Sequence, residues 1–498
     1  MSKTPSTRLF DLIHSMSQTE KRYFKINSVK KEGGESHQFL EMFDSISKMA
    51  VYDEEALRKQ LEEGGNSKHL AFRKSHLYDL ILSTLRRYHK TKSPEFEVLN
   101  LLQDVKLTFD RGLFEQAERL ILKLKKKCVD YNFHQHLVSV AYWEKRIIGA
   151  LVGKTVKRSM NYNTERMVLQ KLVGEQYSLL TYLRKENELW NLRAELIDMY
   201  RFEGGENERS IADCKKSLDK VLELAPDNKD HFKLQIQTNV INTLISYFEG
   251  DLNEGISAQK KVIAQLEENP KVIESDLDIY AAELNNLATF SFLINELETV
   301  SDCVNKLEKI MNKPEVKSNV FFSSRVFSFY QLNVLRYYNS QGDYKSSVDS
   351  FQKKRFEQSA RSMNRYKQFQ IEYNVVLAYF FGGQLKEALK MINRIVNSPT
   401  KVRLKNLSFI RCLAYTIHYV SGNHSLLESI QASKDKAFLK DLRENRSERI
   451  LLTGLTNMIL KPDKIEQVRA DLLREYSNEV DKKSFFQKEL IEFLENSI

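Results

Sequence analysis

One spacing pattern recurs along this chain and restricts the folds that it can adopt. In the stretch SQGDYKSSVDSF, Gly342 is followed two residues later by Tyr344, five later by Ser347 and nine later by Phe351. Similar residues, with polar exceptions, stand at these distances from Gly112, Gly250, Asn295, Gly383 and Gly422. From Gly250 onward the anchors recur roughly every 40 to 47 residues, a period that predicts a repeated structural unit.

Each unit has the pattern of a helix-turn-helix pair. A glycine or asparagine can end a helix in the left-handed conformation. The residue two places on then packs in the turn, and a small residue five places on lets the two helices approach closely. Weaker anchors at Gly153 and Gly205 lie in the long interval between Gly112 and Gly250, so about eight units are expected.

The scarcity of turn-forming residues favours helices throughout. The 498 residues include only 17 glycines and 7 prolines, which disfavours sheets with tight hairpins. Hydrophobic residues at 42% and charged residues at 29% can supply the two faces of amphipathic helices. The sequence therefore predicts an all-α chain, too long to form one compact core.

At this point the units resemble a known family. GDYKSSVDSFQKK, GQLKEALKMINRI and GLFEQAERLILKL are similar to tetratricopeptide repeats, and VLELAPDN resembles the end of that family's second helix. The resemblance implies a right-handed α-solenoid over residues 95–440. Residues 1–94 do not follow the repeat and suggest a small helical N-terminal domain, either helix-turn-helix-like or a cap of the solenoid. Residues 441–498, where the anchor fades, suggest C-terminal capping helices. The period exceeds the family's 34 residues, which suggests longer helices, as in bacterial peptide-sensing regulators of this superfamily.

The resemblance also implies a binding groove on the concave side. In this family the first helix of each unit lines the groove, and an asparagine nine residues before the glycine contacts the backbone of a bound peptide. Three successive units have asparagine there, and an arginine follows one of them on the same helix face. The residues expected to contact a protein or peptide partner are Asn286, Asn333, Arg336, Tyr373, Asn374 and Phe380. Hydrogen bonding between repeats is the alternative role for the asparagines.

The N-terminal region contains a strongly basic segment. Residues 68–92, KHLAFRKSHLYDLILSTLRRYHKTK, include seven Lys or Arg and one acid. This pattern is typical of a DNA-reading helix that would use Arg73, Lys74, Arg86 and Arg87. It is equally typical of a core helix with a solvated rim, and both interpretations stay open.

Signatures of catalysis and of metal binding are absent from the sequence. It contains no Gly-rich phosphate loop, GxSxG elbow, HExxH or Cys/His cluster. His134 and His136 are spaced so that their rings point in different directions on a helix. Asp276 and Asp278 stand where a helix should begin, and acids are favourable there. We therefore expect a protein that is not an enzyme and uses no cofactor.

The remaining features suggest a cytoplasmic protein. Cys128, Cys214, Cys303 and Cys412 form no CxxC pair and are expected to be reduced core thiols. No apolar run reaches membrane-spanning length and no leader is evident, so no membrane partner is expected. The leading hypothesis is a protein- or peptide-binding scaffold or regulator. The alternative is a transcriptional regulator with N-terminal DNA-binding helices; the net charge of +10 permits it without requiring it.

Overall fold

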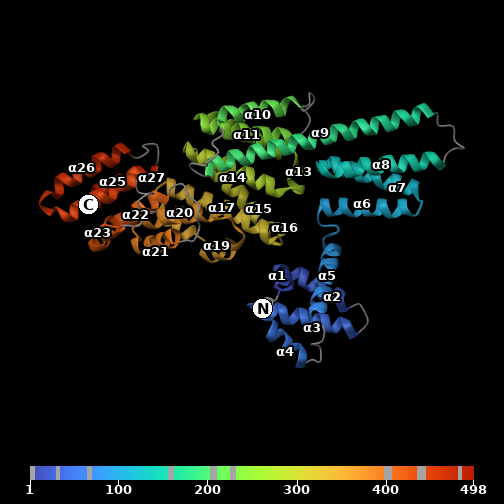
Figure 1. Cartoon of the computed structure of the whole chain (residues 1–498), viewed down its shortest axis with the longest axis horizontal. Helices are drawn as coiled ribbons and strands as arrows, with labels where there is room; N and C mark the ends of the chain where they lie inside the picture. The colour runs from blue at the N-terminus through green and yellow to red at the C-terminus, as the bar shows by residue number, and fades with distance from the viewer. Residues whose placement is uncertain are drawn as a thin grey trace.

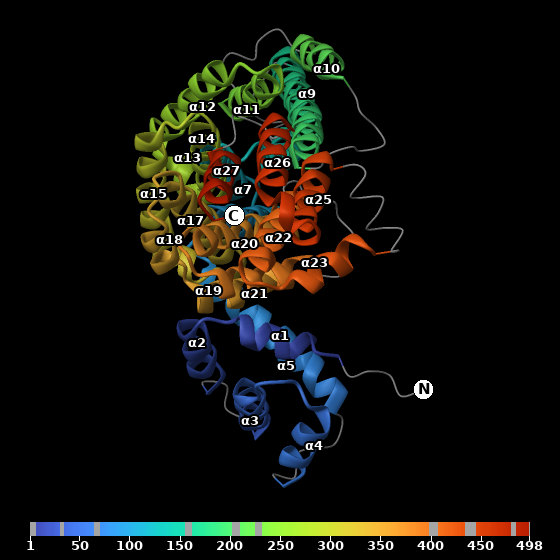
Figure 2. The same ribbon diagram turned by 90° about the vertical axis from the view of Figure 1, so that its left-hand side faces the viewer.

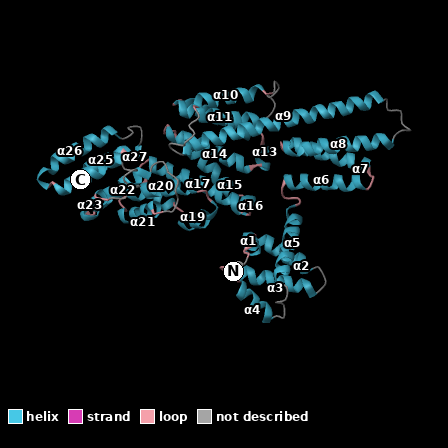
Figure 3. Ribbon diagram, in the orientation of Figure 1, coloured by secondary structure: helices cyan, strands magenta, loops and turns pink. Residues whose placement is uncertain are grey.

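The chain is helical along its described length. The computed structural model describes residues 6–29, 34–63, 70–154, 162–201, 210–224, 232–397, 407–433, 445–479 and 485–497. Within these ranges the residues form helices and connecting turns, without a strand (Figure 3). The all-α prediction is therefore confirmed. None of the described helices has an apolar stretch that could cross a membrane.

Five helices form an N-terminal group with its own apolar core. They are α1 (Arg8–Ser15), α2 (Gln18–Val29), α3 (Gly34–Lys48), α4 (Glu54–Glu63) and α5 (Leu70–His89). Ser17 and Glu20 begin α2 as a reciprocal cap: the Ser17 N–H donates to the Glu20 carboxylate at 2.8 Å, and the Glu20 N–H donates to Ser17 Oγ at 3.3 Å. Figure 1 shows this group below the rest of the chain, joined to it through α5.

The remaining helices follow one another along a curved path (Figures 1 and 2). The first are α6 (Pro94–Asp110), α7 (Phe114–Asp130), α8 (His134–Lys154), α9 (Tyr162–Arg201), α10 (Ile211–Glu223), α11 (Phe232–Glu249), α12 (Leu252–Glu267), α13 (Pro270–Ser275), α14 (Leu277–Leu293) and α15 (Leu297–Met311). After these come α16 (Pro314–Lys317), α17 (Val320–Ser340), α18 (Tyr344–Ser350), α19 (Lys353–Ser359), η2 (Ala360–Ser362), α20 (Arg365–Phe381) and α21 (Leu385–Val396). The chain continues with α22 (Leu407–Val420), α23 (His424–Gln431), α25 (Arg446–Leu460), η3 (Pro462–Lys464), α26 (Ile465–Glu479) and α27 (Phe485–Ser497).

The turns between paired helices have one geometry. The residues with left-handed φ, between 58° and 84°, are Gly112, Asn132, Gly250, Asn295, Gly342, Gly383 and Gly422. At Gly342 the N–H bonds to the Asn339 carbonyl at 3.1 Å, and the next N–H, of Asp343, bonds to the Tyr338 carbonyl at 3.1 Å. These two bonds satisfy carbonyls at the end of α17. The six stronger predicted anchors adopt this conformation, the weaker anchor Gly153 does not, and Asn132 was not predicted.

A small residue stands five places after Gly112, Gly250, Gly342 and Gly383, and it is in tight contact, as expected. Ala117, Ser347 and Ala388 are fully buried where the second helix of a pair crosses the first. At Gly255 a Cβ atom would lie 3.2 Å from the Thr243 carbonyl oxygen, so α11 and α12 approach more closely there than a larger residue would allow. The four cysteines are also buried and unpaired, in agreement with the sequence.

The interval between Gly112 and Gly250 differs from the prediction. Gly153 lies inside α8 and does not form a turn, and Gly205 lies outside the described residues. The long helix α9 occupies 40 residues of this interval. It contains no proline and no left-handed residue, so nothing in its backbone ends it early. Regular pairs of similar length therefore do not fill this part of the chain.

The last helix returns to the middle of the chain. The ring of Phe493, on α27, lies 4.8 Å from the ring of Phe380 on α20. The hydroxyl of Tyr344 donates to the carboxylate of Glu489, also on α27, and the Tyr344 ring stacks on Phe381 at 5.6 Å. Residues of α20, α22 and α25–α27 share one apolar core. Tyr344, the first residue of α18, thus contacts the C-terminal helix α27 as well as α20.

The turn geometry can be tested at Gly342. Its φ of +69° is unfavourable for a residue with a Cβ atom, although the space around it is open. We expect Gly342→Ala to lower the free energy of unfolding by about 1 to 2 kcal/mol, measured by thermal or chemical denaturation. Gly149→Ala is the matched control, because Gly149 lies inside α8 with open space around it and no left-handed φ. An equal effect of the two substitutions would contradict the proposed role of the turn.

Glu489 should make the stability of the chain depend on pH. Burial, with the nearby charge of Glu492, raises the pKa of Glu489 from 4.5 to about 7. The folded state therefore holds a proton that the unfolded state releases, so this contribution to stability is complete below pH 4.5 and is lost as the pH rises through 7. We expect Glu489→Gln to raise the melting temperature at pH 8, with a smaller difference at pH 5. Exposed Glu495→Gln, on the same helix, should change neither.

Candidate functional site

A cavity of about 350 Å³ opens between alternate helices of the curved path. We call it the inner cavity; α9, α11, α14, α17, α20 and the residues just before α20 line it. Its charged and amide-bearing residues are Arg193, Asn285, Asn286, Arg325, Arg336, Asn364, Lys367 and Gln370. None of the described residues that line it is acidic. Aromatic side chains, among them Phe290, Phe321 and Phe329, complete its wall.

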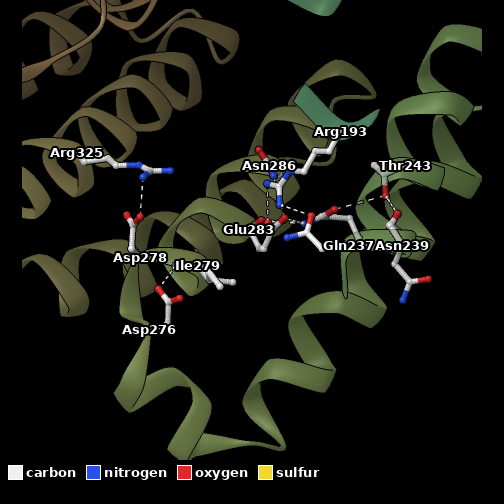
Figure 4. A network of polar contacts seen from close by, with 11 residues as sticks. Arg193, Gln237, Asn239, Thr243, Asp276, Asp278, Ile279, Glu283, Asn286 and Arg325 are labelled. Carbon is white, nitrogen blue, oxygen red and sulfur yellow. Dashed lines mark hydrogen bonds and ion pairs between the residues drawn. The ribbon is translucent and has the colours of Figure 1, made fainter. Parts of the chain in front are cut away.

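Arg193 is held by a buried carboxylate. Its Nη2 donates to Glu283 at 2.9 Å and its Nη1 donates to Gln237 at 3.2 Å. Glu283 is 1% exposed and also accepts from Gln259 and from Asn286, each at 2.9 Å. Figure 4 shows Arg193 directed at Glu283, with Asn286 beside them. The position of this guanidinium is therefore set by contacts from α11 and α14, and Gln259 of α12 holds the carboxylate in place.

Arg325 separates the inner cavity from a more acidic one. Its Nη1 donates to Asp278 at 2.6 Å (Figure 4), and burial raises the pKa of that aspartate while the charge of Arg325 opposes the rise. The second cavity, of about 500 Å³, shares Arg193 and Arg325 with the inner cavity. Its acidic lining residues are Glu186, Asp198, Asp276, Asp278 and Glu283. The two cavities thus differ in charge.

Arg336 and Lys367 contact neutral groups in the inner cavity. Arg336 donates to Thr289 Oγ1 at 3.0 Å and to Gln370 Oε1 at 3.4 Å. Lys367 donates to Asn285 Oδ1 at 3.2 Å, and its ammonium lies 5.1 Å from the centre of the Phe329 ring. These hydrogen bonds orient the two cations at the cavity.

The predicted groove residues lie in different environments. Asn286 and Arg336 line the inner cavity. Asn333 and Asn374 are 0% and 3% exposed, and neither lines it. Asn333 donates to Asn285 Oδ1 at 3.3 Å and to the Phe329 carbonyl at 2.9 Å. The amide of Asn374 donates to the carbonyl of the residue four before it at 2.8 Å. Their side chains therefore make contacts inside the helix layer.

The two predicted aromatic contacts also lie in the helix layer. Phe380 is fully buried and packs against Phe381 and the C-terminal helix. Tyr373 is partly buried, with its ring 6.2 Å from Phe369 and 6.5 Å from Phe409, and burial raises its pKa. Neither lines the inner cavity. Phe290, Phe321 and Phe329 supply the aromatic surface there instead.

The basic residues of α5 are not equivalent. Lys74 Nζ lies 2.5 Å from Glu54 and 2.6 Å from the Tyr52 hydroxyl, and its side chain is 13% exposed. Arg73 is partly buried, whereas Arg86 and Arg87 are exposed in the last turn of the helix. Lys74 thus joins α5 to α4 in the N-terminal group. Only the last turn of α5 presents exposed charge among these four predicted residues.

The other candidate residues have structural surroundings. The ring of His134 stacks on Tyr182 at 4.2 Å, while His136 lies 3.3 Å from Glu95. Asp276 caps α14 by accepting from the Ile279 N–H at 3.2 Å, as its position in the sequence predicted. Within the described residues, no group of three His, Cys, Asp or Glu could hold a metal ion.

Several lining residues were missed in the sequence. Arg193 reaches the cavity from α9, which has no anchor residue of the repeat pattern. Lys367 lies on α20, about two helical turns before the predicted Asn374. Asn285 is the neighbour of predicted Asn286, and Gln370 lies one turn before Asn374. The period-based signal identified three of the lining helices, α14, α17 and α20. It did not identify which face of each helix lines the cavity.

No protein-family model, curated protein or solved structure matches this chain. A functional hypothesis must therefore rest on the geometry and the chemistry of the cavity.

The structural contacts of Asn333 can be tested directly. Loss of its amide would remove a hydrogen bond from Asn285 Oδ1 on α14 and one from the Phe329 carbonyl on α17. We therefore expect Asn333→Ala to lower the free energy of unfolding by about 1 to 3 kcal/mol. Asn100→Ala is the control, because Asn100 also donates to the carbonyl four residues earlier, at 2.6 Å, but on an exposed part of α6. Its effect should stay within about 0.5 kcal/mol. Melting temperatures that agree between Asn333→Ala and the native chain would contradict the structural role.

Proposed function

We propose that this protein is a non-catalytic scaffold or regulator that binds a peptide or protein segment in the inner cavity of a tetratricopeptide-like α-solenoid. The observation on which the proposal depends is the inner cavity itself. It joins four cations, several amides and an aromatic wall on helices from successive pairs. Charged, amide and aromatic groups on one concave surface are typical of sites that recognise peptides.

The solenoid part of the proposal is supported by the path of the chain. Successive helix pairs are connected by turns of one geometry and pack mainly on their neighbours. Alternate helices, namely α11, α14, α17 and α20, contribute to the same cavity. A stack of this kind has one surface made by the first helix of every pair, which suits an extended segment that contacts several pairs at once.

Binding of nucleic acid by the N-terminal group is the weaker alternative. Exposed Arg86 and Arg87 favour it, since they could contact phosphates. Lys74, which would belong to the same contact surface, is instead paired with Glu54. The inner cavity lies on other helices and has no role in this alternative.

The proposal can be tested by placing a photoreactive side chain at the cavity. Phe321 lines it and is 60% exposed, whereas neighbouring Val320 is 55% exposed and does not line it. With p-benzoylphenylalanine at position 321, irradiation with a randomised library of synthetic peptides should give peptide adducts, detected by mass spectrometry. The same group at position 320 should give few. Equal labelling at the two positions, or none at 321, would contradict the proposal.

A further inference from the structure

We infer that the inner cavity binds an uncharged carboxamide, namely the side chain of a glutamine or asparagine next to an apolar or aromatic residue of the bound peptide. This inference rests on the proposed peptide-binding function and specifies which group of the peptide enters the same site. It follows from three amide groups of the lining, whose unpaired ends match the two ends of a carboxamide, and from the aromatic wall.

Two buried amide groups present hydrogen-bond donors to the cavity. Asn285 and Gln370 line it and are each 7% exposed. Asn285 Oδ1 accepts from Lys367, and Gln370 Oε1 accepts from Arg336. Lysine and arginine side chains only donate, so these contacts determine which end of each amide is the oxygen. The other ends are Asn285 Nδ2 and Gln370 Nε2, and neither has an acceptor among the described residues.

A third amide presents an acceptor. Asn286 lines the cavity, and its Nδ2 donates to Glu283 at 2.9 Å. Because Glu283 also accepts from Arg193 at 2.9 Å, it is a carboxylate that only accepts, and the contact fixes the orientation of the asparagine. Figure 4 shows the three side chains together. The remaining end, Asn286 Oδ1, has no donor within the described part of the chain.

The two donors lie on helices that face each other across the cavity. Arg336 donates to Thr289 on α14 at 3.0 Å and to Gln370 on α20 at 3.4 Å. Lys367 on α20 donates to Asn285 on α14 at 3.2 Å. Thr289 lies one turn after Asn285, and Lys367 lies one turn before Gln370. These contacts therefore bring the two amides to the same part of the lining, and the acceptor comes from the residue next to Asn285.

A carboxamide matches these three groups. Its oxygen has two lone pairs and can accept from both amide donors, while its NH₂ group can donate to Asn286 Oδ1. A carboxylate only accepts, so it would leave Asn286 Oδ1 without a donor. An apolar side chain would leave all three groups unpaired, which is costly at buried positions. The lining does not call for an anion, because Arg193 and Arg325 already pair with carboxylates of this chain.

Burial and the aromatic wall favour a side chain as the source of the carboxamide. A cavity of about 350 Å³ can hold one or two side chains, whereas an extended backbone with its own side chains would remain at the mouth. Groups that are 7% exposed are therefore reached by a side chain that enters the cavity. Phe321 lines the cavity and is 60% exposed, so it can contact the apolar or aromatic neighbour of that side chain.

The inference can be tested with three short peptides and the full chain. The probes are N-acetyl-Phe-Gln-Phe-amide and its counterparts with Met or Glu in place of Gln, and binding is measured by isothermal titration calorimetry. Met has a similar length without the amide, Glu has a similar shape with a charge, and the backbone is the same in all three. We expect the Gln peptide to bind about tenfold tighter than either counterpart, or more.

Variants of the amides should remove this preference. Gln370→Met and Asn286→Leu keep a similar volume but lose a hydrogen-bonding end, so each should reduce the preference for Gln over Met to about twofold or less. Gln341→Met, at an exposed position just after α17, should leave the preference unchanged. Asn286 is only partly buried, so its variant keeps the test valid if Gln370→Met lowers the melting temperature.

Each other outcome has a definite meaning. Equal binding of the Gln and Met peptides, or binding of none of the three, overturns the carboxamide site. Tighter binding of the Glu peptide shows that the cavity takes an anion and overturns it as well. If propionamide alone binds as tightly as the Gln peptide, the cavity takes a small free amide, and the peptide ligand is excluded. Peptide adducts at position 321 without a Gln preference would leave the proposed function intact and contradict only this inference.

Discussion

The arrangement of helices depends on one backbone constraint, the left-handed residue that ends the first helix of each pair. Among the described residues its φ lies between 58° and 84° at seven such turns, and two N–H groups then satisfy the last carbonyls of the helix. Because the chain reverses over so few residues, the second helix must pack against the first. At four of these turns a small residue five positions later lets the two helices approach closely, as Gly255 does beside Thr243.

Buried carboxylates form ion pairs between helices of this stack. Three glutamates at 0% or 1% exposure are paired with arginines: Glu283 with Arg193, Glu372 with Arg365 and Arg394, and Glu448 with Arg411. Such pairs contribute little net stability, but removal of one partner leaves a costly buried charge. They connect α9 with α14, α20 with α21 and α22 with α25. At Glu283 this also positions a cation at the inner cavity, so one interaction connects packing with the candidate site.

The sequence predicted the helices and their turns better than it predicted the site. The anchors could be identified because glycine and asparagine tolerate positive φ, and the expectation held at the six stronger anchors but not at Gly153. Asn286 and Arg336 were placed at the cavity through their spacing from the next turn. Asn333 has the same spacing as Asn286, yet it is fully buried and does not line the cavity. A period identifies equivalent positions, whereas burial depends on which neighbouring helix covers each one.

The cavity also needs residues that no local pattern could connect. Arg193 and Lys367 are separated by more than a third of the chain, and only the curvature of the stack brings α9 and α20 to one cavity. The amino-acid sequence by itself determined where helices end, which residues allow close approach and which faces are apolar, because these properties are local. Tertiary structure decided which amides, cations and aromatic side chains converge at the cavity, because convergence depends on the summed geometry of many turns.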